Sequence, residues 1–343
     1  MKRNIIIAVS AIILTATPVF SQELEDIKLE DIKNKVEKFT DKMIQALPFN
    51  SAIGLNWSDA YVGQFPRFGA GVSIGATTMN FDSVVDLLNV FNIDTPFNVN
   101  ETIRKIGMPL PGYTIDGRIG GFVLPFDIGI KAGFIPQDML SNIFDDFNIG
   151  MKHMLVGADV RYCLINKKVL PINISVGLGV NYLDGGFNAS LPTASSFSFS
   201  NPVTSDVYTI TASDTNAGLE WRTISTELKT QISFPMKIIT PYAGAGVSYA
   251  FSTAGYRLKS EIEIKENGTI INPEDVAELF KEYVGITDIS DSGFESIKNF
   301  HGLSARAFGG ASINLLVIRI DITAMYEFLS GNFGATFGLR VQL

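Results

Sequence analysis

Apolar and polar side chains alternate along most of this chain, most clearly near its C-terminal end. In the last run Phe333, Ala335, Phe337, Leu339, Val341 and Leu343 alternate with Asn332, Gly334, Thr336, Gly338, Arg340 and Gln342. Successive side chains of a β-strand point to opposite faces, so this period of two predicts a strand with one apolar and one polar face. Similar runs begin near residues 68, 115, 126, 156, 172, 222, 239, 303 and 318. The pattern therefore predicts ten clear strands.

The connections between these runs alternate between short and long. Short links lie at 124–125, 166–168, 235–237 and 314–316, and long ones at 79–112, 136–150, 183–218 and 252–302. One short link, at 330–331, falls where a long one is expected. Short periplasmic turns and long outer loops are typical of membrane barrels, in which an even strand number leaves both termini in the periplasm.

The start of the chain indicates export. Residues 1–21 combine a basic start, an apolar stretch from 5 to 14 and small residues before a charged segment, which is typical of a cleaved signal peptide. Hydrophobic residues make up 46% of the sequence, yet no later run approaches the roughly 20 apolar residues of a transmembrane helix. Only helices and closed barrels satisfy all backbone polar groups in lipid.

These observations predict an all-β fold, an antiparallel transmembrane β-barrel over residues 49–343 in the outer membrane, and outer-membrane lipids as its surroundings. We expect roughly 10–14 strands, because the strand-like stretches 53–57, 207–211 and 256–264 could add hairpins. Aromatic residues near the strand ends, among them Trp57, Trp221 and Tyr326, are expected at the lipid headgroups.

Residues 22–48 predict an amphipathic helix that ends before Pro48. Its apolar positions recur at intervals of three and four and are Leu29, Ile32, Val36, Phe39, Met43 and Leu47. This stripe could enter the barrel lumen as a plug, form a coiled coil, or lie on the periplasmic membrane surface. Two further short apolar helices are expected in the outer loops, at 81–91 and 273–284.

Charged side chains on the polar faces of the strands predict an ordered lumen wall. The candidates are Arg319, Asp321, Glu327, Arg340, Asp127, Lys131, Glu227 and Lys229. Such a network would order the wall and set ion preference. Glycines on the same face, such as Gly69 and Gly129, could admit a plug or ligand, or could serve tight curvature of the barrel.

The sequence gives little support for catalysis, a metal or a cofactor. Its two histidines, His153 and His301, belong to no recognised motif, and the sequence leaves open one Ser–His pair, formed by His301 and Ser304. The single cysteine, Cys163, cannot form an internal disulfide. A formal charge of −8 argues against nucleic acid as a partner.

The stretch from Asn56-Trp57-Ser58-Asp59-Ala60-Tyr61 to Gly75 resembles uncharacterised outer-membrane barrel proteins of spirochaete type. The architecture is also similar to the long-chain fatty acid transporter family, although that family's Asn-Pro-Ala start is replaced by Gln22-Glu23-Leu24. The resemblance implies insertion by the barrel-assembly machinery. The first hypothesis for the function is passive or gated transport of a small or hydrophobic solute, with the N-terminal helix and the loop helices as gates. The alternative is a surface-exposed structural or adhesion barrel without transport, and the oligomeric state stays open.

Overall fold

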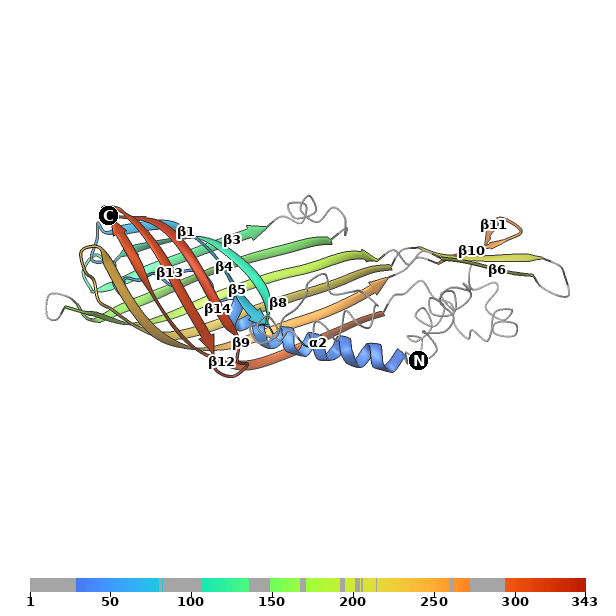
Figure 1. The fold of residues 1–343 in the computed structure, drawn as a ribbon, viewed down its shortest axis with the longest axis horizontal. Helices are drawn as coiled ribbons and strands as arrows, with labels where there is room; N and C mark the ends of the chain where they lie inside the picture. Colours follow the sequence, from blue (N-terminus) through green and yellow to red (C-terminus); the bar gives the residue numbers. More distant parts are fainter. Residues whose placement is uncertain are drawn as a thin grey trace.

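The computed structural model describes residues 29–79, 82, 107–135, 149–166, 171–191, 195–200, 204, 206–213, 215–259, 262–271 and 294–343. Ten antiparallel strands close into a barrel (Figure 1), in the order β1-β14-β13-β12-β9-β8-β5-β4-β3-β2. They are β1 (Phe68–Met79), β2 (Met108–Gly120), β3 (Phe126–Ile135), β4 (Ile149–Ile165), β5 (Asn173–Leu191), β8 (Thr215–Ser233), β9 (Ile239–Lys259), β12 (Phe294–Leu315), β13 (Ile318–Glu327) and β14 (Phe333–Gln342). The predicted antiparallel barrel is confirmed.

The two faces of the barrel wall follow the sequence alternation. Apolar side chains such as Ile115, Ile130 and Leu178 are exposed on the outside, whereas inward neighbours such as Asp116 and Lys131 are buried. An outward apolar face around a closed sheet is the arrangement that a bilayer requires.

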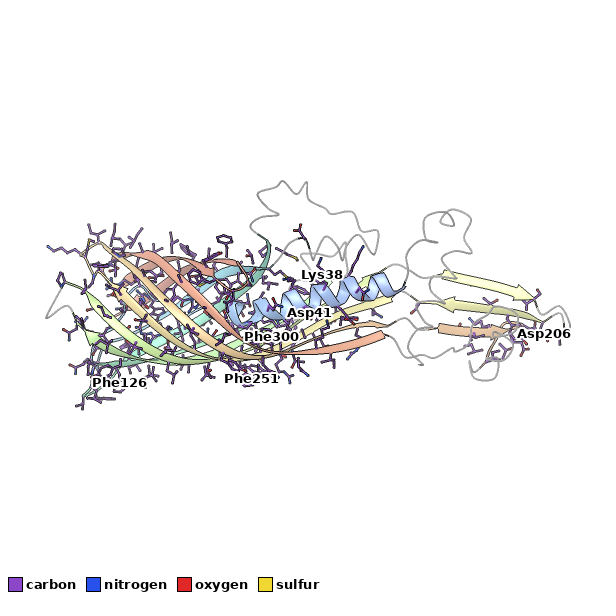
Figure 2. All side chains as sticks on the ribbon, turned by 90° about the horizontal axis from the view of Figure 1, so that it is seen from below. Lys38, Asp41, Phe126, Asp206, Phe251 and Phe300 are labelled. Carbon is purple, nitrogen blue, oxygen red and sulfur yellow. The ribbon has the colours of Figure 1, made fainter. Side chains whose placement is uncertain are left out.

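The barrel has two unlike ends, which we call the turn end and the loop end. At the turn end β2–β3, β8–β9 and β12–β13 are joined by residues 121–125, 234–238 and 316–317. The first and last strands also meet there, where the amide of Leu343 donates to the carbonyl of Phe68 at 2.9 Å. Figure 2 places Phe126 at this end and Asp206 at the far tip of the molecule.

Strands continue well past the barrel at the loop end. β5, β8, β9 and β12 are 19 to 22 residues long, whereas β1, β3, β13 and β14 have 10 to 12. Beyond them lies a four-stranded sheet, which we call the extension, in the order β11-β10-β7-β6. Its strands are β6 (Ser195–Ser200), β7 (Val207–Ala212), β10 (Ile262–Glu266) and β11 (Thr269–Ile271).

The extension corrects two of the predicted loops. Much of 183–218 and 252–302 is strand, and 207–211 belongs to the extension instead of adding to the barrel. The alternation weakens at these positions because strands outside a bilayer need no apolar outward face.

The hairpin predicted at 53–57 is wrong, since residues 51–67 contain no strand. The link after β1 ends at Met108 and not at 112. The link predicted at 136–150 ends before Ile149, where β4 begins. The predicted loop helices at 81–91 and 273–284 lie outside the described residues except for Asp82, which is helical.

The N-terminal helix is present as α2 (Leu29–Asn50) and lies at the loop end, with its first residues pointing away from the barrel (Figure 1). The predicted stop before Pro48 is wrong, because the helix includes this proline. The amide of Ser51 still donates to the carbonyl of Leu47 at 2.9 Å, so the helical hydrogen bonding resumes beyond the proline.

Candidate functional site in the barrel lumen

Residues 51–62, which we call the lumen segment, run through the barrel from the loop end to the turn end. At the loop end Asn50, the residue just before the segment, donates from Nδ2 to Thr77 Oγ1 at 2.9 Å and to the carbonyl of Leu110 at 3.0 Å. At the turn end the amide of Val62 donates to Asp127 Oδ2 at 3.1 Å. All residues from 51 to 60 are buried. The chain therefore enters β1 only after crossing the interior of its own barrel.

The irregular backbone of the lumen segment is hydrogen-bonded by side chains of the barrel wall, where a β-strand would be bonded by its neighbouring strand. Lys131 Nζ donates to the carbonyls of Ser51 and Ile53 at 2.7 and 2.6 Å. Asp116 Oδ2 accepts from the amide of Leu55 at 3.1 Å, and Gln231 Nε2 donates to the carbonyl of Trp57 at 2.7 Å. Buried backbone groups need partners, and here the polar face of the sheet supplies them.

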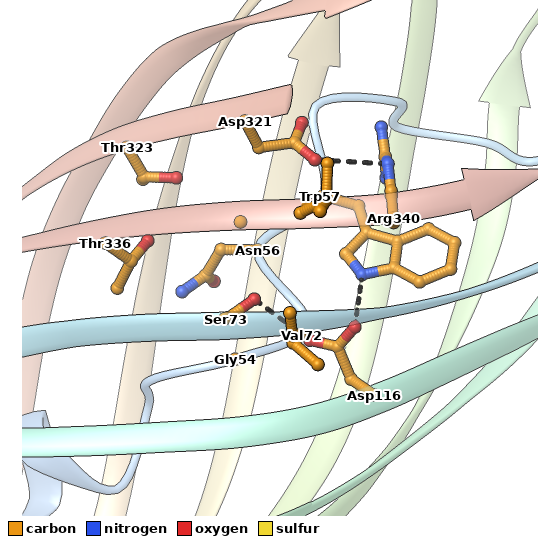
Figure 3. A pocket seen from close by; sticks show the side chains of 12 residues that line it. Gly54, Asn56, Trp57, Val72, Ser73, Asp116, Asp321, Thr323, Thr336 and Arg340 are labelled. Carbon is orange, nitrogen blue, oxygen red and sulfur yellow. Dashed lines mark hydrogen bonds and ion pairs between the residues drawn. The ribbon is translucent and has the colours of Figure 1, made fainter. Parts of the chain in front are cut away.

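The Trp57 side chain lies in the lumen against β14, β1 and β2, and Figure 3 shows it between Asp116 and Arg340. Its Nε1 donates to Asp116 Oδ1 at 2.9 Å. The guanidinium carbons of Arg118 and Arg340 lie 5.7 and 4.5 Å from a ring centroid of the indole, within the range of cation–π attraction. The predicted place of Trp57 at the lipid headgroups is therefore wrong. Trp221 is likewise buried, whereas Tyr326 is partly exposed.

Two inward glycines of the wall make room for this segment. A Cβ on Gly69 would lie 2.9 Å from Trp57, and one on Gly112 would lie 2.7 Å from Ile53 Cδ1. A Cβ on Gly129 would instead approach Asp159 Oδ1 to 2.6 Å. The small residues thus admit both the lumen segment and the charged side chains of the wall itself.

A charge cluster fills the lumen near the turn end. Arg118 pairs with Asp127 at 2.5 Å and with Asp159 at 2.7 Å. Arg161 pairs with Asp127 at 2.9 Å, and Lys229 pairs with Asp159 at 2.6 Å. Buried ions are tolerated when they are paired and hydrogen-bonded. Arg161 also donates to the carbonyl of Asp59 at 2.8 Å, so the cluster holds the lumen segment.

A second group of ion pairs involves β12, β13 and β14 together with Glu227 of β8. Arg340 pairs with Asp59 at 3.0 Å and with Asp321 at 3.1 Å. Arg306 pairs with Glu227 at 2.8 Å and donates to Asn56 Oδ1 at 3.2 Å. Both arginines therefore connect the wall to the lumen segment.

The predicted lumen residues separate into two sets. Asp127, Lys131, Glu227, Lys229, Asp321 and Arg340 meet in the network around the lumen segment. Glu327 instead accepts hydrogen bonds from the amides of Leu329 and Ser330 in the β13–β14 turn. Arg319 is half-buried, and within the described residues it enters none of these ion pairs.

Five further wall residues that hold the network are absent from the predicted set, namely Asp116, Arg118, Asp159, Arg161 and Arg306. All occupy inward positions in alternating strands, so the period of two could have found them. The lumen segment has no such period. Only the partners that it meets in three dimensions show its place.

The inner end of α2 is held by apolar contacts. Phe39, Met43 and Leu47 are buried in a cluster that also contains Trp221 and Phe308 of the wall. Leu29, Ile32 and Val36 belong to the helix, but their side chains lie outside the described residues. Toward the outer part of the helix, Lys298 Nζ pairs with Asp41 at 2.9 Å.

A narrow pocket lies between α2 and the wall. Met43, Leu47, Leu110, Phe187 and Trp221 contribute its apolar lining, and His153 contributes a buried imidazole. His301 projects outward against the ring of Phe251, whereas Ser304 of the same strand is buried. His301 and Ser304 therefore lie on opposite faces of β12 and do not form the pair that we considered.

Several solved outer-membrane barrels are similar in fold. The outer membrane protease OmpT from Escherichia coli has 11% identity and a TM-score of 0.39, covering 81% of this chain and 97% of its own. The attachment invasion locus protein Ail of Yersinia pestis has 8% identity and a TM-score of 0.27, with 80% and 95% covered. The monoaromatic hydrocarbon channel CymD has 8% identity and a TM-score of 0.24, with 87% and 91% covered. These values are too low to carry function from those proteins to this chain.

No curated protein matches the sequence. One family model, described as Lsa36-like, matches residues 16–343 and so spans the whole barrel, the lumen segment and the extension. The chain belongs to the Lsa36-like family.

Proposed function

We propose that the protein is a closed outer-membrane barrel that acts as a surface scaffold, whose long strands hold the extension outside the cell for contact with partners. The observation that carries this proposal is the lumen segment, buried along its length and bonded to the wall at both ends. The proposal reverses the preference for transport that the sequence favoured.

A conducting path would require the lumen segment to leave. The carbonyls of Ser51 and Ile53 would lose Lys131, and Asp59 would lose Arg340. Breaking a buried ion pair costs several kcal/mol because an uncompensated charge remains. The pocket beside Trp57 in Figure 3 leaves space for about one water molecule. Both observations support a closed resting state.

The extension supports a role at the surface. Its strands carry polar residues that are exposed, including Ser196, Ser198 and Ser200 of β6. At its tip Asn267 Nδ2 donates to Asp206 Oδ1 at 2.7 Å, which ties the β10–β11 turn to the start of β7. A sheet held this far from the membrane has no use in passage through the lumen, but it presents an ordered surface for binding. The proposal includes no catalytic step.

Gated transport of a small hydrophobic solute is the second candidate, and one observation favours it. The pocket lined by Met43, Leu47, Leu110 and Trp221 is apolar and lies at the mouth of the lumen. An apolar solute entering there would still meet the lumen segment below, so transport would require the segment to move.

The test is single-channel conductance of the refolded protein in planar bilayers. We expect wild type to be silent and Trp57→Ala to admit small currents, because the largest side chain of the lumen segment is removed. Ile270→Ala, on the exposed edge of the extension, serves as the control and should stay silent. Steady conductance of the wild-type protein, or uptake of a monoaromatic probe into vesicles that contain it, would instead support transport.

A second variant tests the scaffold directly. Replacing residues 192–214 and 260–293 with short turns removes the extension while leaving the ten barrel strands joined. We expect this variant to insert and to keep the heat-sensitive gel mobility of a folded barrel. Failure to fold would show that the extension serves assembly instead of surface contact.

A further inference from the structure

The turn end carries an unusual number of exposed apolar side chains. Phe122, Val123 and Leu124 of the β2–β3 turn are 73%, 81% and 57% exposed. Met236 and Ile238 of the β8–β9 turn are 60% and 66% exposed, and Leu316 of the β12–β13 turn is 98% exposed. We call these six residues the turn-end patch. Exposed apolar side chains gathered at one end of a molecule mark a contact with a membrane or a protein.

The backbone conformation at Leu316 disfavours leucine, which indicates that the apolar side chain itself is required at this position. Leu316 has a φ of 56°, a left-handed conformation that favours Gly, Asn or Asp. The β10–β11 turn has a comparable residue, Asn267 with a φ of 48°, followed by Gly268. The turn on the extension thus uses the expected residues, and the turn end uses a leucine. Strain of this kind persists where the surroundings or the function require it.

Carbonyl groups of the turn backbone also accept hydrogen bonds from the protein itself, although in water solvent could satisfy them. Gln64 Nε2 donates to the carbonyl of Val123 at 2.9 Å, and Asn314 Nδ2 donates to that of Met236 at 3.2 Å. The amide of Gln342 donates to the carbonyl of Val317 at 2.8 Å. Satisfied carbonyls at turn tips are what a low-dielectric environment demands.

The charged side chains in the described stretches of the turn end are basic. Arg67 and Lys237 are exposed there, and the stretches 62–68, 121–126, 234–239 and 314–320 contain no Asp or Glu. The chain as a whole has a formal charge of −8. Basic side chains beside apolar ones fit a surface of anionic lipid headgroups.

The patch continues the lipid-facing surface of the barrel. Ile128 of β3, Ile239 of β9 and Ile318 of β13 are exposed on the outside directly beside the three turns. We infer that the turn-end patch is immersed in the periplasmic leaflet of the outer membrane, where Arg67 and Lys237 bind the headgroups of anionic phospholipids. This inference is independent of whether the lumen conducts.

Depth is measured with fluorophores on introduced cysteines, because Cys163 is buried and contributes little labelling. Leu316→Cys is compared with Ile270→Cys, an aliphatic residue on the extension that is 63% exposed. In bilayers of brominated phosphatidylcholine we expect about twofold or greater quenching at position 316 and none at 270. Equal signals at the two positions would overturn the inference. So would excimer formation between pyrene labels at position 316, which would indicate that a second copy covers the patch.

Leu316→Asn separates lipid contact from turn geometry. In a turn that faces water, asparagine would suit the left-handed backbone and raise the urea midpoint of unfolding. We expect the midpoint in phospholipid vesicles to fall, because a polar side chain replaces an immersed leucine. A rise in the midpoint would contradict the inference.

Anionic lipid is tested with vesicles of phosphatidylcholine, with and without phosphatidylglycerol, at low salt. We expect phosphatidylglycerol to raise the Tm of wild type, and the double variant Arg67→Gln/Lys237→Gln to lose that rise. Arg222→Gln is the matched control, since Arg222 is an exposed cation of β8 toward the loop end. A wild-type Tm indifferent to phosphatidylglycerol would exclude recognition of anionic headgroups.

Discussion

The inner end of α2 and the lumen segment are held in the barrel in different ways. The inner end of α2 packs Phe39, Met43 and Leu47 against apolar wall residues at the loop end. In the lumen segment Ile53 belongs to the same apolar cluster, and the segment is bonded in addition to charged wall side chains, among them Lys131 and Arg340. Apolar packing tolerates sliding and repacking, whereas bonds to specific buried charges do not. We therefore expect the lumen segment, more than the helix, to keep the barrel closed.

Removing a charge from the cluster near the turn end should lower the free energy of unfolding most. Asp127→Asn keeps the shape of the side chain but leaves Arg118 and Arg161 with less countercharge in a buried site. We expect a loss of about 3–5 kcal/mol in the free energy of unfolding. Urea titration of the reconstituted barrel, followed by gel mobility, measures it. Asp206→Asn, at the tip of the extension, is the control, and equal losses in the two variants would show that the cluster does not hold the fold.

Truncating the helix stripe should cost less than the charge variant. Leu47→Ala leaves a cavity among buried apolar side chains, and we expect a loss of about 2–4 kcal/mol. The same titration compares it with Gln45→Ala, an exposed position of α2. Unlike Trp57→Ala, this variant should stay silent in planar bilayers. Currents through it would place the closure at the helix and not at the lumen segment.

A neutral contact to the lumen segment should have an intermediate effect. Gln231→Ala removes the donor to the carbonyls of Trp57 and Ser58, with an expected loss of about 1–2 kcal/mol. Thr226→Ala, outward on the same strand, should change the stability by less than about 0.5 kcal/mol. If the two variants behave alike, the amide contacts add nothing to closure.

The ion pair on the outer part of the helix should matter least. Lys298 reaches Asp41 across a partly exposed contact, and such pairs contribute about 0–1 kcal/mol. Lys298→Gln should therefore leave the urea midpoint almost unchanged in high salt and lower it slightly in low salt. A large, salt-independent loss would mean that α2 is fixed as firmly as the lumen segment.

The sequence predicted the barrel because a bilayer imposes a period of two on every strand that crosses it. The same reasoning read Asp184-Gly185-Gly186 as part of a loop, although these residues lie in β5. Strands outside lipid keep their backbone pairing without the apolar outward face, so the signal disappears while the structure continues.

The candidate site was predicted only in part, for a different reason. Asp127, Lys131 and Arg340 could be placed on the inner wall because they sit on alternating strands. Trp57 was assigned to the membrane interface because a tryptophan near a strand start usually lies there. Its true place depends on Asp116, Arg118 and Arg340, which lie far away in sequence. An irregular segment that is bonded side chain by side chain leaves no periodic trace.

If the chain threads its own barrel, α2 and the extension lie on one side of the membrane and the turn end lies on the other. Intact cells that carry Lys35→Cys, Asn267→Cys or Leu316→Cys can be labelled with a membrane-impermeant maleimide. Lys35 is exposed on α2, Asn267 on the extension and Leu316 at the turn end. We predict labelling at positions 35 and 267 and none at 316. Protection of position 35 together with labelling at 267 would contradict the threaded arrangement.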